Sequence, residues 1–155
     1  MHEYILSGLH RQNKAMELLQ SLLVEEFDFL VERDAEAVVQ LEFSIHELLR
    51  QIASEKMLVI RLLDGQKVRD YAQGLAEDAR DAVLDLLRTL DELEQRCARQ
   101  ATQNTELSLG LLDQSRALLN TLHSQIAPKT GNTYGKRGAM SSIRRPDAAL
   151  LVGRL

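Results

Sequence analysis

Apolar residues recur at helical spacing along most of the chain. The first stripe contains Ile5, Leu9, Met16, Leu19, Leu23 and Leu30, and the second contains Val38, Leu41, Ile45, Leu48, Ile52, Val59 and Leu62. Steps of three, four and seven residues place side chains on one face of an α-helix. The pattern therefore predicts two long amphipathic helices. The first ends near Arg33 and Asp34, and the second ends at Asp64 and Gly65, because glycine accepts the left-handed conformation that terminates helices.

A third stripe begins after a less regular stretch, residues 66–75. It contains Ala79, Val83, Leu86, Leu90, Leu93 and Cys97, and it continues through Gln100, Asn104, Leu107, Leu111, Gln114 and Leu118. Pro128 cannot extend a helix and disfavours helix at the residue before it, so we expect this helix to end near Ile126. The predicted fold class is all-α, an elongated antiparallel bundle of three long helices.

The third helix is too long to pack on the first two along its whole length. At ~1.5 Å per residue, residues 76–126 would span roughly 75 Å, whereas helices of about 30 residues span roughly 45 Å. Either the helix breaks, near 100–104 or at Gly110, and a fourth helix folds back, or its end lacks intramolecular partners. In the second case the leucines of this end need another partner: Leu107, Leu111, Leu112, Leu118, Leu119 and Leu122.

Three polar residues, Gln100, Asn104 and Gln114, occupy positions where the third stripe predicts apolar side chains. One interpretation is structural, because buried polar groups set register or oligomer state in coiled coils. The other is that this half of the helix is not permanently buried. We favour the second interpretation because the three positions cluster in one half of the helix.

Composition and charge divide the chain into two regions. Only 4% of the 155 residues are aromatic and none is Trp, which argues against a β-sandwich or barrel. Residues 1–126 hold 13 Lys and Arg against 22 Asp and Glu, a net charge of −9. Residues 127–155 hold six Lys and Arg against one Asp, a net charge of +5, together with both prolines and four of the eight glycines. We predict a helical bundle over 1–126 and a basic, mostly flexible tail over 127–155.

No segment of the sequence resembles a targeting or membrane signal. The N-terminus lacks a basic region followed by an apolar core, and the longest uninterrupted apolar run is five residues, 148–152. A membrane-spanning helix needs about 20. The single cysteine, Cys97, excludes an intramolecular disulfide and a cysteine-based zinc site, and its place on the third stripe indicates a small core residue. These observations predict a cytoplasmic protein without membrane insertion.

The sequence offers no constellation for catalysis, metal or cofactor binding. It contains no glycine-rich phosphate loop and no H-x-x-x-H, and none of its four histidines follows a glutamate by three positions, as di-iron bundles require. Nucleic acid is also disfavoured. The basic residues of the tail, Lys136, Arg137, Arg144 and Arg145, have only Tyr134 interleaved and adjoin an acidic body without an evident recognition helix. We therefore expect no enzyme activity, no metal, no cofactor and no nucleic-acid partner.

Three features together resemble the FlgN-type flagellar export chaperones. They are two long amphipathic helices joined by a short Arg-Asp turn, a third helix with Gln103 and Asn104 before a leucine-rich end, and a tail that reads Tyr134-Gly135-x-x-Gly138. The resemblance covers nearly the full length, and the Tyr-Gly-x-x-Gly segment is its most specific part. It implies a cytoplasmic chaperone that binds the C-terminal helical ends of the hook–filament junction proteins (the hook-associated proteins) and delivers them to the flagellar type III export apparatus.

The resemblance also assigns roles to residues. It implies that the N-terminal helices are mainly structural and that the leucine-rich stretch 107–122 is the client surface. It makes Tyr134, with Gly135 and Gly138, a candidate docking segment for the export gate. The alternative interpretation is a structural coiled-coil adaptor or self-assembling scaffold that releases no client. A homo-oligomer is compatible with either interpretation.

Overall fold

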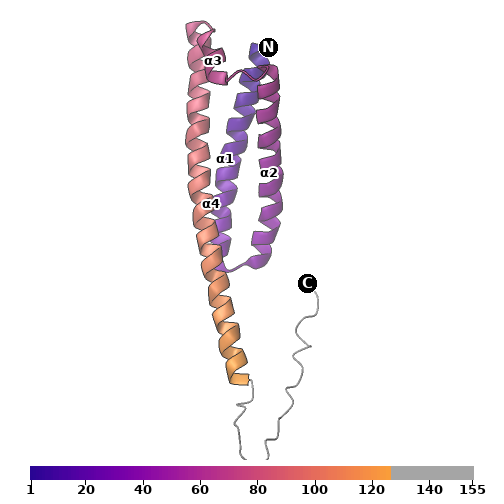
Figure 1. The fold of residues 1–155 in the computed structure, drawn as a ribbon, viewed down its shortest axis with the longest axis vertical. Helices are drawn as coiled ribbons and strands as arrows, with labels where there is room; N and C mark the ends of the chain where they lie inside the picture. The colour runs from indigo at the N-terminus through magenta and orange to yellow at the C-terminus, as the bar shows by residue number, and fades with distance from the viewer. Residues whose placement is uncertain (127–155) are drawn as a thin grey trace, which may run out of the picture. The chain divides into compact units, whose positions relative to one another are not determined.

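A computed structural model describes residues 1–126, which are almost entirely α-helical. The helices are α1 (His2–Glu32), α2 (Ala35–Leu62), α3 (Val68–Gln73) and α4 (Glu77–Ile126), and no strand occurs in this part of the chain (Figure 1). The predicted all-α class and the predicted end of the last helix at Ile126 are confirmed. The alternative of a break near 100–104 is not realised, because α4 runs through these residues without interruption.

Both predicted helix ends are confirmed, each with its own turn chemistry. Arg33 closes α1 in the left-handed conformation, with a φ of 60°. Asp34 then begins α2, and its carboxylate accepts a hydrogen bond of 3.0 Å from the N–H of Ala37, as N-cap residues do. After α2 the chain turns at Asp64 and Gly65, which both have a positive φ. The two turns bring successive long helices into antiparallel order.

The long helices pack together within the compact unit Met1–Asp113. In this unit α2 is antiparallel to α1, and α4 runs parallel to α1 (Figure 1). Polar side chains bridge α1 and α4 to backbone carbonyls in the same order along both helices. Asn13 donates to the Leu86 carbonyl at 3.1 Å, and farther along Asn104 donates to the Leu23 carbonyl at 2.7 Å. Both bonds are formed in the register that the two parallel helices have. The second unit starts at Gln114, and its described part is the end of α4.

The buried residues form two apolar clusters, and all but one of them lie on or beside the predicted stripes. The larger cluster contains Met16, Leu19 and Leu23 of α1, Ile45 and Leu48 of α2, and Leu90, Leu93 and Cys97 of α4. The smaller cluster lies near α3 and contains Ile5, Leu9, Val59, Leu63, Ala72 and Val83. Ala72 belongs to the short helix that the sequence pattern left unclear. The first two stripes and the third as far as Asn104 therefore supply the core, as the spacing predicted.

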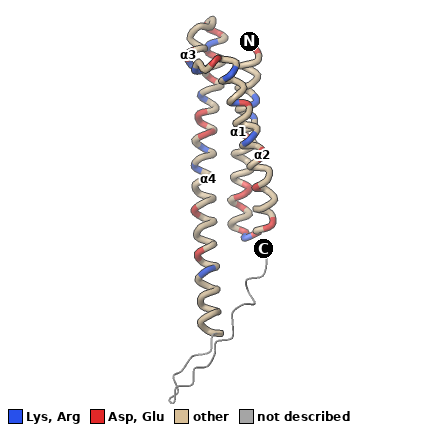
Figure 2. Tube along the Cα trace, turned by 45° about the vertical axis from the view of Figure 1, so that its right-hand side comes forward, with Lys and Arg blue, Asp and Glu red and all other residues tan. Residues whose placement is uncertain are grey.

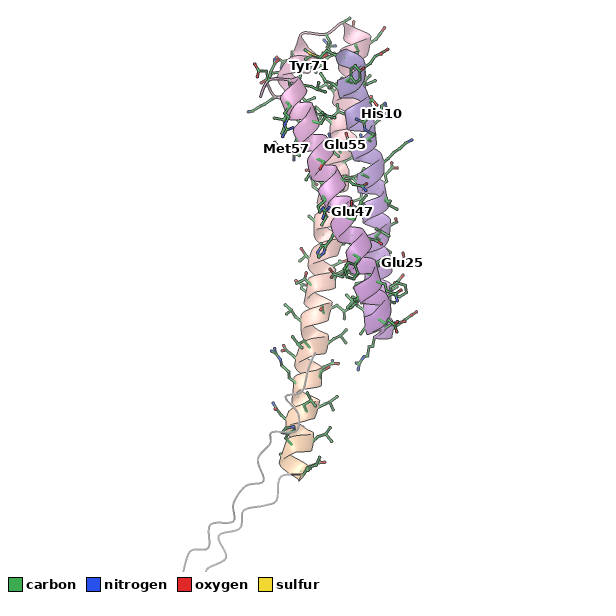
Figure 3. All side chains as sticks on the ribbon, turned by 90° about the vertical axis from the view of Figure 1, so that its right-hand side faces the viewer. His10, Glu25, Glu47, Glu55, Met57 and Tyr71 are labelled. Atoms are coloured by element: carbon green, nitrogen blue, oxygen red, sulfur yellow. The ribbon has the colours of Figure 1, made fainter. Side chains whose placement is uncertain are left out.

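Polar contacts hold α2 and α3 to their neighbours. Glu55, which interrupts the apolar stripe of α2, receives two hydrogen bonds of 2.8 and 2.9 Å from the guanidinium of Arg11 on α1. The hydrogen bond to Glu55 raises the pKa of Arg11. Tyr71 lies at the α3 end of the bundle, where its hydroxyl shares a hydrogen bond of 3.2 Å with Nδ1 of His2 (Figure 3). Short α3 is thereby tied to the start of α1.

Gly8 allows α1 and α2 to approach closely. A Cβ atom at this position would lie 2.9 Å from Cγ2 of Val59, which is closer than such atoms pack. Val59 is buried and its χ1 is restricted by β-branching, so it has little freedom to move away. The contact between α1 and α2 at this point therefore requires glycine at position 8.

Cys97 is expected to resist alkylation in the folded chain. Its thiol is buried in the larger cluster, and burial raises its pKa because the thiolate loses solvation. Iodoacetamide at neutral pH should therefore modify Cys97 only when the bundle opens, and the rate should rise steeply as denaturant is added. Mass spectrometry of the modified chain measures that rate. Rapid modification without denaturant would contradict the buried position.

Candidate functional site

Burial along α4 stops at Asn104. The buried residues of this helix are Val83, Leu90, Leu93, Cys97 and Asn104. After Asn104 the helix continues to Ile126 without a further buried residue, and every residue from 112 to 126 is exposed. The helix thus has one part that completes the core and one part, residues 112–126, that is exposed to solvent.

The six leucines predicted as the client surface all lie on this second part of α4. Leu107 and Leu111 are half-buried, whereas the other four are exposed, namely Leu112, Leu118, Leu119 and Leu122. Leu118 has 63% of its surface exposed, which is unusual for a leucine in a helix that also supplies a core. Tyr134, Gly135 and Gly138 lie outside the described residues.

The exposed apolar residues share one face of the helix. At 3.6 residues per turn, successive side chains are rotated by about 100°. The six leucines and Ile126 then fall within an arc of about 140°, with Leu107 at one edge and Leu112 at the other. We call these seven residues the leucine face: Leu107, Leu111, Leu112, Leu118, Leu119, Leu122 and Ile126. Leu109 is also exposed but lies outside this arc.

Charge is scarce around the leucine face. Residues 77–106 of α4 contain 12 Asp, Glu, Lys and Arg, whereas residues 107–126 contain only Asp113 and Arg116. Figure 2 shows the change as the loss of red and blue segments toward the end of α4. Depletion of charge together with exposed apolar side chains is typical of the centre of a protein–protein interface. This end of α4 is therefore the best candidate for a binding surface.

Asn104 is a structural residue, which corrects the interpretation that we favoured from the sequence. Only 3% of its surface is exposed. Its Nδ2 donates to the Leu23 carbonyl at 2.7 Å and to Oε2 of Glu26 at 2.6 Å, and its Oδ1 accepts from Nε2 of Gln100 at 3.0 Å. The register-setting interpretation therefore holds for Asn104 and its partner Gln100. Gln114 differs from them, because it is exposed.

A second exposed apolar area lies between α1 and α2 and was not predicted from the sequence. It is a shallow hollow, which we call the α1–α2 hollow, and it is lined by Leu18, Leu22, Phe43, Ser44, Glu47, Leu48 and Gln51. Phe43 is 75% exposed and Leu18 is about half exposed. Neither residue belongs to a predicted stripe. Large apolar residues outside the stripes are the only indication of this area in the sequence. The hollow is lined by the charged residue Glu47, and it has fewer exposed apolar residues than the leucine face.

Within residues 1–126 no group of three or more His, Cys, Asp or Glu side chains is placed to hold a metal ion. In the same part of the chain, no helix combines the length and apolar character needed to cross a membrane.

Comparison with known proteins gives one result that covers most of the chain. The model of a protein family described as FlgN protein matches residues 1–142, which include all four helices. Searches of curated protein sequences and of solved structures returned no significant match.

Proposed function

This chain belongs to the FlgN family of flagellar export chaperones, and from this premise we propose that it binds the C-terminal helical ends of hook–filament junction proteins in the cytoplasm and delivers them to the flagellar type III export apparatus. The observation that carries the proposal is the leucine face of α4. Seven apolar residues share one face of a helix that has almost no charge over the same length.

The physical reason concerns an amphipathic helix at the end of a client. Left uncovered, the apolar face of such a helix promotes aggregation or early polymerisation. A second helix with an exposed apolar face covers it, in the way that helices bind grooves through residues spaced three, four and seven apart. Residues 107–126 supply such a face, and none of them is among the buried residues of α4.

Replacing Leu111 and Leu118 together with Ala is expected to weaken client binding at least about tenfold, which corresponds to about 1.4 kcal/mol. The free energy of unfolding should change less, because Leu118 is exposed, Leu111 is only half-buried and alanine is the best helix former. Isothermal titration calorimetry with purified junction proteins measures the affinity, and thermal denaturation measures the stability. Leu109→Ala is the matched control, since Leu109 is an exposed leucine of the same segment outside the leucine face.

The α1–α2 hollow supplies the contrasting variant. Phe43→Ala removes its most exposed apolar side chain and should leave client affinity unchanged. Normal binding by the Leu111 and Leu118 variant, together with lost binding by Phe43→Ala, would assign the client site to the hollow.

The rival function, a self-assembling adaptor, predicts an oligomer that is unaffected by junction proteins. A chaperone should bind its client in place of any contact between its own copies, which light scattering with and without client distinguishes.

Tyr134→Ala is expected to reduce secretion of the junction proteins while helicity, melting temperature and client affinity stay nearly unchanged. Tyr134 follows Pro128 in the sequence and belongs to none of the apolar stripes, and its ring offers apolar area and a hydroxyl at low rotamer cost. Gly135 and Gly138 let the backbone approach a partner closely. Secretion assays on cells that carry the variant make the test. Normal secretion would contradict a docking role, and lost client binding would assign Tyr134 to the client site instead.

A further inference from the structure

The negative charge of the helical body is concentrated at one end of the α1–α2 hairpin. Residues 15–49 hold one Lys or Arg against nine Asp and Glu, a net charge of −8. The other described residues, 1–14 and 50–126, hold 12 Lys and Arg against 13 Asp and Glu, a net charge of −1. Figure 2 shows the red segments on the part of the hairpin nearest the turn between α1 and α2. We call residues 15–49 the acidic hairpin end.

The α1–α2 hollow lies within the acidic hairpin end. Leu18 and Leu22 line it, and each directly precedes a core residue, Leu19 or Leu23. Adjacent residues of a helix are rotated by about 100°, so the hollow lies beside the core-facing side of α1 rather than on it. Because α4 packs on the core-facing side, Leu18 and Phe43 of the hollow stay exposed. The hollow is thus an apolar groove between two antiparallel helices.

Carboxylates without ion-pair partners lie along both edges of the hollow. On α1, Leu18, Glu25 and Glu32 follow one another at intervals of seven residues, which places them on one side of the helix. On α2, Glu36 and Phe43 are also seven residues apart. Glu25, Glu32 and Glu36 are exposed, and none of the ion pairs within residues 1–126 involves them. They are available to cations of a partner.

Charge decides which class of partner fits the hollow. A net charge of −8 repels the phosphates of nucleic acids and the headgroups of anionic lipids. A helix without charge would cover the apolar side chains but would leave the carboxylates without partners. A helix with an apolar side flanked by Lys and Arg would cover Leu18 and Phe43 and also pair with the carboxylates.

We propose that the α1–α2 hollow binds a cationic amphipathic helix of a second protein. The apolar side of this helix contacts Leu18 and Phe43, and its Lys and Arg side chains pair with Glu25 and Glu36. From Leu18 to Glu32, α1 rises about 21 Å, which is the length of a helix of about 14 residues. The site is separate from the leucine face, because no residue of the leucine face lines the hollow. The proposal therefore does not depend on the client.

Two synthetic helical peptides serve as probes. They share one leucine stripe, and their polar side carries Lys in one peptide and Glu in the other. Fluorescence anisotropy measures their affinity for the full chain. Phe43→Ala removes the apolar contact, and Glu25→Gln with Glu36→Gln removes one carboxylate from each helix. The matched control is Glu92→Gln with Glu94→Gln, which neutralises two exposed carboxylates outside the acidic hairpin end. Circular dichroism checks that each variant stays helical.

The Lys peptide is expected to bind at least about tenfold more tightly than the Glu peptide, and less tightly near about 1 M salt, where the Debye length is about 3 Å. Phe43→Ala should lower its affinity at least about fivefold, and the Glu25 and Glu36 variant at least about threefold. The control should change it less than about twofold. Equal affinity of the two peptides, or unchanged affinity in either hollow variant, would overturn the proposal.

Other occupants of the hollow, and another site for the peptide, give different results. Loss of Lys-peptide binding in Leu118→Ala but not in Phe43→Ala would place the peptide on the leucine face. A dimer that Phe43→Ala converts to a monomer in sedimentation equilibrium would show that a second copy covers the hollow. Tighter peptide binding after all six Lys and Arg of residues 127–155 are replaced with Gln would identify the chain's own tail as the occupant. Each of these results would overturn the proposal.

Discussion

Truncating Leu90 to Ala is expected to lower the free energy of unfolding by about 2–5 kcal/mol. Leu90 is buried in the larger core cluster, where it packs with residues of all three long helices. Removing its terminal carbons loses apolar burial and leaves a cavity that surrounding side chains of fixed helices cannot fill completely. Urea denaturation followed by circular dichroism measures the loss. Leu48→Ala, in the same cluster but on α2, should give a loss in the same range.

Leu84→Ala provides the control for this experiment. Leu84 lies on α4 as Leu90 does, but more than a third of its surface is exposed, so its truncation should cost well under half as much. Equal effects at Leu84 and Leu90 would show that helix propensity or solvent-exposed contacts dominate. Unchanged melting temperatures for both Leu48→Ala and Leu90→Ala would contradict the assignment of the stripes to the core.

The helices and their ends could be predicted because they depend on local chemistry and on period. Apolar side chains at steps of three, four and seven share one face only in a helix. Leu19, Leu48 and Leu90 therefore identify the core-facing sides of their helices, whichever helices pack against them. The turns at Asp34 and Gly65 follow from capping preferences of single residues. Neither the apolar spacing nor the capping preference depends on how the helices are arranged relative to one another.

The buried polar residues could not be interpreted from the sequence for the opposite reason. Asn13 and Asn104 are stabilised by backbone carbonyls of another helix, and whether a carbonyl lies within reach depends on the register between α1 and α4. That register results from packing along the whole bundle. A polar residue at a stripe position is thus equally consistent with an exposed helix end and with a buried bridge. The structure decides for the bridge at Asn104.

The candidate site was predictable in part. Length predicted that the last helix either breaks or has an end without intramolecular partners. The helix is unbroken, and Leu112, Leu118, Leu119 and Leu122 near its end are exposed. The exposure of Phe43 was not predictable, because a phenylalanine beside an apolar stripe is as easily half-buried as open. The prediction that Tyr134 docks to the export gate stays a prediction, since Tyr134 lies outside the described part of the chain.

Replacing Asn104 with Asp is expected to destabilise the fold by about 3 kcal/mol or more at pH 7. The two side chains have nearly the same shape, but the carboxylate has no N–H to donate. It would face the Leu23 carbonyl and the Glu26 carboxylate, which both accept hydrogen bonds from Nδ2 in the native chain at 2.7 and 2.6 Å. Three acceptors would then meet at a site that is nearly closed to solvent.

The pH dependence gives this prediction its direction. Burial and the neighbouring Glu26 would raise the pKa of the introduced carboxyl in the folded state above the value of about 3.9 that it has when unfolded. The destabilisation relative to the native chain is therefore largest above the folded-state pKa, and it shrinks as the pH falls toward 4, where the protonated carboxyl can donate again. Gln103→Glu makes the same change in charge at the adjacent, exposed position and should alter stability by less than about 0.5 kcal/mol at any pH. Urea denaturation at pH 7 and pH 4 measures both variants. If Asn104→Asp were as mild as Gln103→Glu at pH 7, the hydrogen bonds of Asn104 would not hold α4 to α1, and the register of the two helices would rest on the apolar clusters and on the hydrogen bond from Asn13 to the Leu86 carbonyl.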